Sequence, residues 1–431
     1  MSSECHNIKE LYKKFVQFPF ISTDTRKIRP NSLFFCLKGA HFDGNLFVNE
    51  AIEKGANYVI TENDWLPKSK SIIVVDDVLK TLQQLANYHR NQLKIPVIGI
   101  TGTNGKTTTK ELMAAVLAKK YKTAFTQGNL NNHIGVPLTL LAIKSDDEIA
   151  VIEMGANHVG EIAELCQIVQ PDYGLITNIG KAHLEGFGSI ENIIETKTEL
   201  YKAAKTIFVN KNDEILRQKA ESRKQKAESR KQKAESVFYG SSTEISGEII
   251  KMNPYLVIQL FSTTIQTKLT GSYNLPNILG AAAVGRFFGV SKNNICDAIA
   301  EYTPQNNRSQ IIINKTNTLI ADYYNANPTS MKAALDNFSQ IEAPQKLAIL
   351  GDMLELGKNS SSEHQVIIDF CKSENMETMF IGTNFYSLKT KDAHFFMNIE
   401  EFNDSLKNNK IENRLILLKG SRGIGLEDII L

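Results

Sequence analysis

The stretch Gly99-Ile100-Thr101-Gly102-Thr103-Asn104-Gly105-Lys106-Thr107-Thr108-Thr109 decides the central part of the fold. It continues an apolar, strand-like segment (Val97–Ile100) and leads into a helix-like one (110–119). A glycine-rich turn between a strand and a helix points backbone N–H groups at an anion. Lys106 adds a positive charge for phosphate, and the Thr107 hydroxyl suits Mg²⁺. The stretch therefore predicts a nucleoside triphosphate site, formed by Gly102, Thr103, Asn104, Gly105, Lys106, Thr107 and Thr108.

This phosphate-loop motif departs from the standard pattern at one position. The pattern places a glycine five residues before Gly105, where this chain has Ile100. The alternative reading is a chance glycine-rich turn before a helix. We favour the phosphate loop because the strand, the glycines, the lysine and the threonine all agree with the context that the motif requires.

The length and composition limit the classes of protein to which this chain can belong. A chain of 431 residues suggests about three domains. Five scattered cysteines without a CxxC pair indicate reduced thiols rather than a disulfide framework or a zinc site. No apolar run approaches the roughly 20 residues of a membrane span, and the N-terminal residues lack the features of a secretion signal. We therefore expect a cytoplasmic protein, and the net charge of +2 gives no argument for a nucleic-acid partner.

One segment differs in composition from the rest of the chain. Residues 223–229 and 230–236 are identical copies of RKQKAES, and 216–222 is a near copy. Alanine is the only apolar residue in each exact copy, whereas a coiled coil needs two apolar positions per heptad. We interpret the segment as a solvated helical or disordered insertion that arose by tandem duplication. The alternative is a basic arm that binds nucleic acid or a membrane.

Three regions follow one another along the chain. We expect domains at 1–85, 86–304 and 305–431. Alternating strands and helices in the second and third regions favour an α/β fold with doubly wound parallel sheets, whose ligands bind beyond the carboxyl ends of the strands. The expected strands are Ser32–Leu37, Tyr58–Thr61, Ser71–Val75, Val97–Thr101, Ile149–Met154, Gly174–Asn178, Thr206–Asn210, Thr318–Asp322, Leu347–Leu350, Thr378–Ile381 and Arg414–Leu418. We expect helices at Phe47–Gly55 and Leu79–Leu93.

Two residues follow strands of the central region at the edge where the phosphate loop lies. Glu153 ends one expected strand, which is the usual place for a Mg²⁺ ligand, although a glutamate in a plain strand-end turn fits as well. His183 follows the next strand. A lone histidine is more often structural than a ligand, but its place beyond the same sheet edge favours a ligand. Lys197 lies on a helix with a charged face and by composition is a solvated lysine.

Seven longer motifs together carry a family resemblance. They are GTNGKT (102–107), GNLNNHIGVPLTLL (128–141), EMGANHVGEI (153–162), TNIGKAHLEGFGS (177–189), YNANPTSM (324–331), GDMLELG (351–357) and KGSR (419–422). The chain resembles the Mur ligases from about residue 21 to its C-terminus, apart from the 216–236 repeat. The resemblance implies a uridine-nucleotide domain, a central ATP-binding domain and a C-terminal Rossmann-like α/β domain.

The resemblance also implies an activity. Mur ligases use ATP to convert a carboxylate into an acyl phosphate, which an amine then displaces. The motifs are most similar to those of members that add D-alanyl-D-alanine to UDP-N-acetylmuramoyl-tripeptide during peptidoglycan precursor synthesis. ATP and Mg²⁺ are the implied cofactors, and a monomer is expected.

The resemblance assigns expected roles to individual residues. The catalytic group is Lys106, Glu153, His183 and Lys197, and the lysine that matches Lys197 in related ligases is carbamylated. The metal ligands are Thr107, Glu153, His183 and carbamylated Lys197. Further ATP contacts are Asn274, Asn277, Arg308, Asp322 and Asn325. Candidate substrate contacts are Thr23, Asp24, Thr25, Arg26, Lys38, Gly39, Asp43, Asn131, Asn132, Asn157, His158, Asn327, Asp352, Glu355, Lys419, Ser421 and Arg422.

The motifs depart from the family pattern at four positions. The chain has Thr25 where serine is more common, Tyr273 where histidine is common, Asn307 where a glycine usually precedes the arginine, and Ala321 where an acidic residue is common.

Three other functions remain as alternatives to the dipeptide ligase: a sister ligase that adds a single amino acid, a folate-polyglutamate ligase, and a nucleotide-gated binding module without ligation. YNANP and GDMLELG favour the dipeptide ligase over the first two. Glu153, His183 and Lys197 argue against the binding module, which needs no second metal cluster.

Overall fold

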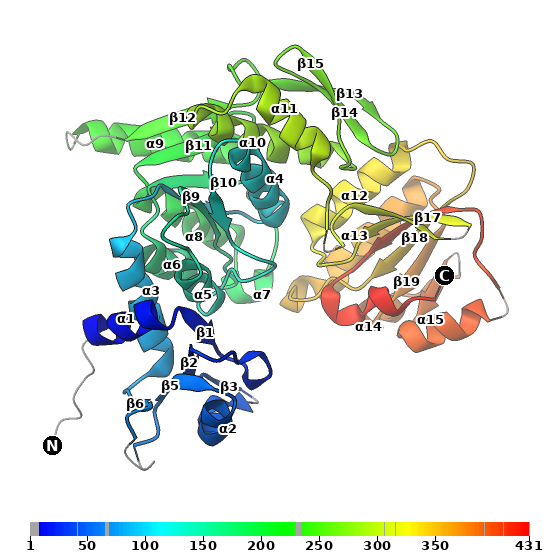
Figure 1. Ribbon diagram of the computed structural model, residues 1–431. Coiled ribbons are helices and arrows are strands. Elements are labelled where there is room, and N and C mark those ends of the chain that lie inside the picture. The colour runs from blue at the N-terminus through cyan, green and yellow to red at the C-terminus, as the bar shows by residue number, and fades with distance from the viewer. Residues whose placement is uncertain are drawn as a thin grey trace.

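The computed structural model describes residues 8–40, 42–64, 69–229, 234–305, 307–314, 316–391, 393–407 and 409–430 (Figure 1). Three regions, each with its own sheet, follow one another along the chain, so the expected α/β class with parallel sheets is confirmed. Cys5 and residues 230–233 of the repeat lie outside the described residues. Cys36, Cys166, Cys296 and Cys371 are free and buried. No helix among the described residues is long and apolar enough to cross a membrane.

The first region contains a parallel sheet in the order β1-β2-β5-β6 and a small β3-β4 hairpin. Strand β2 is buried along its whole length, which accounts for its continuous apolar sequence. One hydrophobic core continues from this sheet through α3 into the central region, so α3 joins the two regions. The elements are α1 (Ile8–Gln17), β1 (Phe20–Ser22), η1 (Thr25–Lys27), β2 (Ser32–Phe35), β3 (Lys38–Gly39), β4 (Phe42–Asp43), η2 (Gly44–Phe47), α2 (Val48–Glu53), β5 (Ala56–Thr61), β6 (Ile72–Val74) and α3 (Val78–Gln92).

The central region is built on a six-stranded parallel sheet in the order β12-β11-β10-β7-β9-β8. Separate apolar cores cover its two faces, as expected for a doubly wound sheet. The elements are β7 (Val97–Thr101), α4 (Lys106–Ala118), β8 (Thr123–Phe125), α5 (Gly135–Leu141), β9 (Ile149–Glu153), α6 (Glu161–Val169), β10 (Tyr173–Ile176), α7 (Leu184–Phe187), α8 (Ile190–Ala203), β11 (Thr206–Asn210), α9 (Glu214–Ser229) and β12 (Glu235–Tyr239).

A three-stranded antiparallel sheet and two helices complete the central region (Figure 1, top). Helices α10 and α11 pack with α4 over one face of the parallel sheet. The elements are β13 (Gly247–Met252), β14 (Leu256–Leu260), β15 (Thr263–Gln266), η3 (Ser272–Asn274), α10 (Leu275–Phe287) and α11 (Lys292–Glu301).

The third region contains a six-stranded sheet in the order β16-β17-β21-β18-β19-β20, in which only β16 runs antiparallel. Its two faces also carry separate cores. The elements are β16 (Gln310–Asn314), β17 (Asn317–Asp322), α12 (Pro328–Gln340), β18 (Lys346–Gly351), η4 (Gly357–Asn359), α13 (Ser360–Ser373), β19 (Thr378–Ile381), α14 (Thr383–Ser387), β20 (His394–Phe396), α15 (Ile399–Leu406), β21 (Leu415–Lys419), η5 (Arg422–Ile424) and η6 (Leu426–Asp428).

The repeat segment forms a helix whose side chains are mostly exposed, but it is also partly built into the fold, which its interpretation as an insertion did not include. Residues 214–229 form the helix α9, whose Leu216, Ala220 and Ala227 are buried. The guanidinium of Arg223 donates hydrogen bonds to the carbonyl oxygens of residues 201, 204, 205 and 235 at 2.7–3.2 Å. The last two residues of the second copy begin β12, an edge strand of the central sheet. The helical part of the expectation is confirmed for α9.

Candidate active site

The phosphate loop connects β7 to α4, at the carboxyl end of the central sheet. Gly102 and Gly105 have φ angles of +139° and +76°, which favour glycine, and a Cβ on Gly105 would lie 2.5 Å from Asn277 Oδ1. Helix α4 begins at Lys106, four residues earlier than expected, because the turn at Gly105 leads directly into it. The loop thus lies at the N-terminus of a 13-residue helix, where free N–H groups bind an anion.

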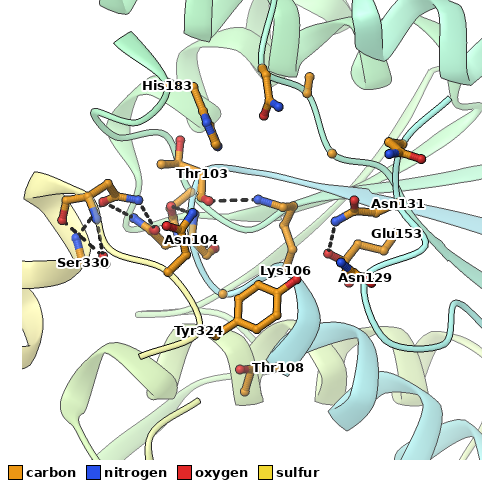
Figure 2. A pocket seen from close by; sticks show the side chains of 18 of the residues that line it. Thr103, Asn104, Lys106, Thr108, Asn129, Asn131, Glu153, His183, Tyr324 and Ser330 are labelled. Carbon is orange, nitrogen blue, oxygen red and sulfur yellow. Dashed lines mark hydrogen bonds between the residues drawn. The ribbon is translucent and has the colours of Figure 1, made fainter. Parts of the chain in front are cut away.

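The ammonium group of Lys106 folds back onto the phosphate loop. Its Nζ donates hydrogen bonds to the carbonyl oxygens of Gly102 at 2.8 Å and Thr103 at 2.9 Å (Figure 2). Burial lowers the pKa of Lys106 to about 8, with Arg308 contributing in the same direction and Glu153 opposing it. The loop gives this lysine only neutral carbonyl oxygens, whereas a bound triphosphate would give it negatively charged oxygens.

Glu153 is held as a buried carboxylate at the end of β9. Its side chain is 1% exposed, and the Thr107 hydroxyl donates to it at 3.0 Å. Asn131 Nδ2 donates to Oε1 at 2.8 Å, and the fully buried ammonium group of Lys110 lies 3.5 Å from Oε2. The structure thus joins Thr107 to Glu153, the pair expected at a metal ion, and adds Asn131, expected at the substrate, and Lys110, which sequence reasoning treated only as the start of a helix.

Lys197 is buried, so the composition-based interpretation of a solvated lysine is wrong. Its side chain is 2% exposed, and Nζ donates to the carbonyl oxygen of Ala156 at 3.2 Å. Nζ also lies 5.4 Å from the ring centroid of Phe187. Burial lowers the pKa of this amine well below its ordinary value, and the nearby positive charge of Lys106 lowers it further. The enclosed environment therefore favours the neutral form of this amine over the ammonium.

His183 stands at the boundary between the central and third regions. It adopts a left-handed backbone conformation (φ 49°), and its Nδ1 lies 2.5 Å from Oε2 of Glu355. The two atoms are in close polar contact, although the carboxylate does not lie along the direction of a hydrogen bond from Nδ1. Contact with His183 lowers the pKa of Glu355. Glu355, a candidate contact of the incoming dipeptide, instead faces this histidine.

Asn274 and Asn277 brace the phosphate loop from α10. Asn277 Nδ2 donates to Asn274 Oδ1 at 2.9 Å, and Asn277 Oδ1 accepts from the Thr109 hydroxyl at 3.1 Å. Tyr273, which stands where the family commonly has histidine, places its hydroxyl 2.8 Å from that of Ser309. The two asparagines line the same cavity as Lys106.

The third region contributes a polar wall opposite the phosphate loop. Lys419 is buried, and its Nζ donates to Asp322 at 2.7 Å. The guanidinium of Arg308 lies 3.7 Å from the ring centroid of Tyr324, and that of Arg422 lies 5.8 Å from it. Tyr324 stands beside Lys106 in Figure 2 and was not selected from the sequence, although it is the first residue of YNANP.

Asparagine pairs join the central and third regions directly. Asn327 Nδ2 donates to Asn104 Oδ1 at 2.8 Å (Figure 2). Asn327 also caps α12, where its side chain accepts from the backbone N–H of Ser330. Its position thus couples the start of α12 to the phosphate loop.

Most residues of the predicted site in the central and third regions line one cavity of about 780 Å³. Of the predicted residues, it is lined by Thr103, Asn104, Gly105, Lys106, Thr108, Asn131, Asn132, Glu153, Asn157, His158, His183, Asn274, Asn277, Arg308, Asp322, Asn325, Asn327 and Lys419. A smaller cavity of about 250 Å³ is lined by Thr107, Tyr324 and Arg422, and Arg308 lines both cavities. No cluster of three histidine, cysteine or acidic side chains that could hold a metal ion occurs in the described part of the chain.

Three predicted residues of the third region line neither cavity: Glu355, which faces His183, and Asp352 and Ser421. Asp352 is 1% exposed and accepts hydrogen bonds from the backbone N–H groups of Asn384 and Phe385, which start α14. Ser421 Oγ accepts from Leu354 N and is also buried. Both side chains are occupied by the fold, so their expected direct contact with a dipeptide is not supported by their placement.

The predicted residues of the first region form local pairs away from the larger cavity. Asp24 accepts two hydrogen bonds from the guanidinium of Arg26, and this contact lowers the pKa of Asp24 to about 2. Lys38 lies 3.7 Å from Asp43 across the β3-β4 hairpin. Thr23, Thr25 and Gly39 are neighbours of these pairs in the sequence. The group faces solvent and is not brought to the phosphate loop.

Comparison with known proteins decides the family. Three family models match successive parts of the chain: Mur ligase family, catalytic domain (17–90), Mur ligase middle domain (100–285), and Mur ligase, glutamate ligase domain (307–422). The UDP-N-acetylmuramoyl-tripeptide–D-alanyl-D-alanine ligase of Bacillus subtilis (strain 168) is 34% identical over 95% of this chain and 92% of its own length. The chain belongs to the Mur ligase family.

Solved structures of other Mur ligases share the fold of this one. The crystal structure of MurF from Acinetobacter baumannii has a TM-score of 0.86 at 29% identity, covering 98% of this chain and 97% of that one. MurF ligase from Thermotoga maritima in complex with ADP has a TM-score of 0.82 at 26% identity, covering 96% of both chains. This Mur ligase is therefore similar over 96% of its length to a structure that contains ADP.

Proposed function

We propose that this Mur ligase joins D-alanyl-D-alanine to UDP-N-acetylmuramoyl-tripeptide with ATP, during peptidoglycan precursor synthesis. The observation that carries the proposal is the single cavity in which the phosphate loop faces Arg308, Asp322 and Lys419 of the third region. The names of the full-length relatives support the choice of substrates. Because ATP and sugar nucleotides are cytoplasmic metabolites, the reaction would take place in the cytoplasm.

The reaction begins at the terminal carboxylate of the tripeptide. An oxygen of this carboxylate attacks the γ-phosphorus of ATP, ADP leaves, and an acyl phosphate forms. The amine of the dipeptide then attacks the acyl carbon, and inorganic phosphate leaves with one of the original carboxylate oxygens. Lys106 and the N–H groups at the start of α4 stabilise the negative charge on the transferred phosphoryl group.

The residues around Glu153 fit a magnesium ion. Thr107 and Glu153 offer the hydroxyl and carboxylate oxygens that Mg²⁺ prefers, and Asn131 and Lys110 hold the carboxylate in place from other sides. Bound Mg²⁺ would supply charge neutralisation at the phosphates. We place Thr107 and Glu153 at one metal position and His183 with Lys197 at another.

Lys197 fits the second position only after carbamylation. An ammonium group is repelled by a divalent cation. The neutral amine, which burial of Lys197 favours, is the form that adds CO₂; the nitrogen then loses a proton, and the product is an anion with two oxygens. The depressed pKa and the enclosed position of Nζ support this modification.

The three family matches suggest which domain binds which substrate. We propose a UDP-sugar-binding domain at 1–85, a central ATP-binding domain at 86–304 and a C-terminal domain at 305–431 that binds the dipeptide and part of ATP. Asp24, Arg26, Lys38 and Asp43 are then the candidates for the nucleotide part of the acceptor. The protein would act as a monomer.

Phosphate release in the presence of ATP, Mg²⁺ and the UDP-tripeptide tests the proposed substrates. We expect release to depend on added amine and to be much faster with D-alanyl-D-alanine than with D-alanine, L-lysine or glutamate. A single amino acid that outperforms the dipeptide would instead indicate a sister ligase. Nucleotide binding without amine-dependent turnover would indicate a binding module.

A further inference from the structure

Two strained residues meet where the third region contacts the central one. His183 and Glu355 both adopt left-handed backbone conformations, with φ angles of 49° and 63°. Non-glycine residues rarely adopt this conformation, and it persists where the surroundings enforce it. Here the backbone N–H of Glu185 donates to the carbonyl oxygen of Glu355 at 3.3 Å, and Leu184 packs on the apolar core of the third region. The two loops are therefore fixed to each other next to the cavity.

The carboxylate of Glu355 occupies one of the two ring nitrogens of His183. Nδ1 is shielded from solvent, and its close polar neighbour among the described side chains is Glu355 Oε2 at 2.5 Å. The contact at Nδ1 leaves Nε2 as the ring nitrogen available to a metal ion, and a carboxylate beside the other nitrogen orients a metal-binding histidine. Figure 2 shows the ring pointing from its loop toward Thr103 and the phosphate loop.

We propose that Glu355 is a positioning residue for His183: it holds the ring so that Nε2 faces the second metal position, and it does so only when the third region is docked. The inference rests on the metal role given to His183 in the proposed function. It assigns Glu355 to the histidine and not to the incoming dipeptide. Docking of the third region would then complete the metal site, which couples closure around the substrates to catalysis.

Metal binding to the full-length chain tests this role without relying on turnover. Mn²⁺ would replace Mg²⁺ in the presence of a non-hydrolysable ATP analogue and the UDP-tripeptide. Electron spin-echo spectroscopy then detects histidine nitrogen bound to Mn²⁺, and a titration gives the affinity. We expect a nitrogen signal in the parent that His183→Ala abolishes. Glu355→Gln should weaken Mn²⁺ binding about 10- to 100-fold and reduce the signal, as for other carboxylates that orient metal-bound histidines.

A second ion pair across the same interface provides the matched control. Lys181, two residues before His183 in the sequence, places its Nζ 2.8 Å from Oε1 of Glu363 in the third region. Glu363→Gln removes one interface carboxylate and should leave the nitrogen signal and the Mn²⁺ affinity unchanged. Glu355 is half exposed, so Glu355→Gln should fold, and its melting temperature verifies this.

Three results would overturn the proposal. The first is a Glu355→Gln variant with the parent's Mn²⁺ affinity and nitrogen signal. The second is a variant in which only the KM for D-alanyl-D-alanine rises, which would assign Glu355 to the incoming amine. The third is a parent enzyme without a nitrogen signal, since His183 would then bind no metal. Amine-dependent phosphate release by the same parent preparation shows separately whether the proposed ligase function stands.

Discussion

At the scale of single residues, Lys106 carries the clearest expectation. Lys106→Ala should lower kcat by about 10²–10³-fold because it removes a charge aimed at the transferred phosphoryl group. The fold should persist, since the hydrogen bonds of Lys106 go only to the loop carbonyls of residues 102 and 103. Steady-state kinetics with a melting curve measures both. Lys119→Ala, at the other end of α4, is the control, and an activity close to that of the parent in Lys106→Ala would remove this lysine from the mechanism.

The depressed pKa of Lys106 predicts a pH dependence. Burial lowers this pKa to about 8 in the free enzyme, so the ammonium form that binds phosphate is lost as the pH rises through that value. The kcat/KM for ATP should therefore fall above about pH 8, since kcat/KM reports the free enzyme. Bound triphosphate favours the ammonium, so the corresponding fall in kcat should occur at higher pH. A kcat/KM profile that is flat between about pH 7 and 9 would contradict this account.

Lys197 should be carbamylated in the active enzyme. Lys197→Ala should lower kcat by about 10²-fold or more, because the variant lacks the anionic oxygens of the second metal position. Short carboxylic acids are expected to restore part of the activity. The parent enzyme in ¹³C-bicarbonate should show a carbamate NMR signal that the variant lacks.

Lys202→Ala is the control for Lys197, because Lys202 is an exposed lysine of the same helix, with 70% of its side chain accessible. It should keep both the signal and the activity. A bare amine on Lys197 in a turning-over enzyme would refute carbamylation.

Residue-level prediction from the sequence succeeded where the motif dictates local geometry. Glu153 is the last residue of β9 and Lys106 follows the short loop after β7, so the strand ends place both at the sheet edge. Lys197 could not be placed by composition, because its burial depends on how α8 packs beside residue 156 and Phe187. Lys110 was missed for the same reason, since its contact with Glu153 joins two elements far apart in the sequence.

At the scale of elements, Arg223 anchors the repeat helix. Its guanidinium binds carbonyl oxygens at the end of α8 and at the start of β12. Arg223→Ala should lower the free energy of unfolding by about 2 kcal/mol because several partly buried carbonyls lose their donor. Denaturant unfolding measures the change. Lys224→Ala should stay within about 0.5 kcal/mol, since Lys224 is exposed. Equal stability of the two variants would contradict the anchoring role.

Two deletions in the repeat should have different effects, because one keeps Arg223 and the other removes it. Deleting residues 224–230 leaves one copy of RKQKAES that still begins with Arg223 and still reaches β12, so turnover should be unchanged. Deleting 223–236 removes Arg223 and the first two residues of β12, so it should destabilise the central sheet. The sequence left a helix and a disordered segment as alternatives and did not predict the packing, because only three small or apolar side chains mark the buried face of α9.

At the scale of the whole molecule, the cleft is an assembly of two sheet-bearing regions. The central region supplies the phosphate loop, and the third region supplies Arg308, Asp322 and Lys419. The alternation of strands and helices predicted both sheets, because parallel sheets require crossover connections. It did not predict which loops meet across the boundary. The contact of Glu355 with His183 depends on that docking, whereas the hydrogen bonds of Asp352 depend on how α14 packs within the third region.

The path of oxygen through the reaction tests the central claim most directly. The full-length enzyme would receive ATP, Mg²⁺, D-alanyl-D-alanine and a UDP-tripeptide whose terminal carboxylate carries two ¹⁸O atoms. Ligation through an acyl phosphate predicts one ¹⁸O in the released phosphate and one in the new amide, detected by mass spectrometry of both products. Unlabelled phosphate, or phosphate release without formation of the amide product, would contradict the account.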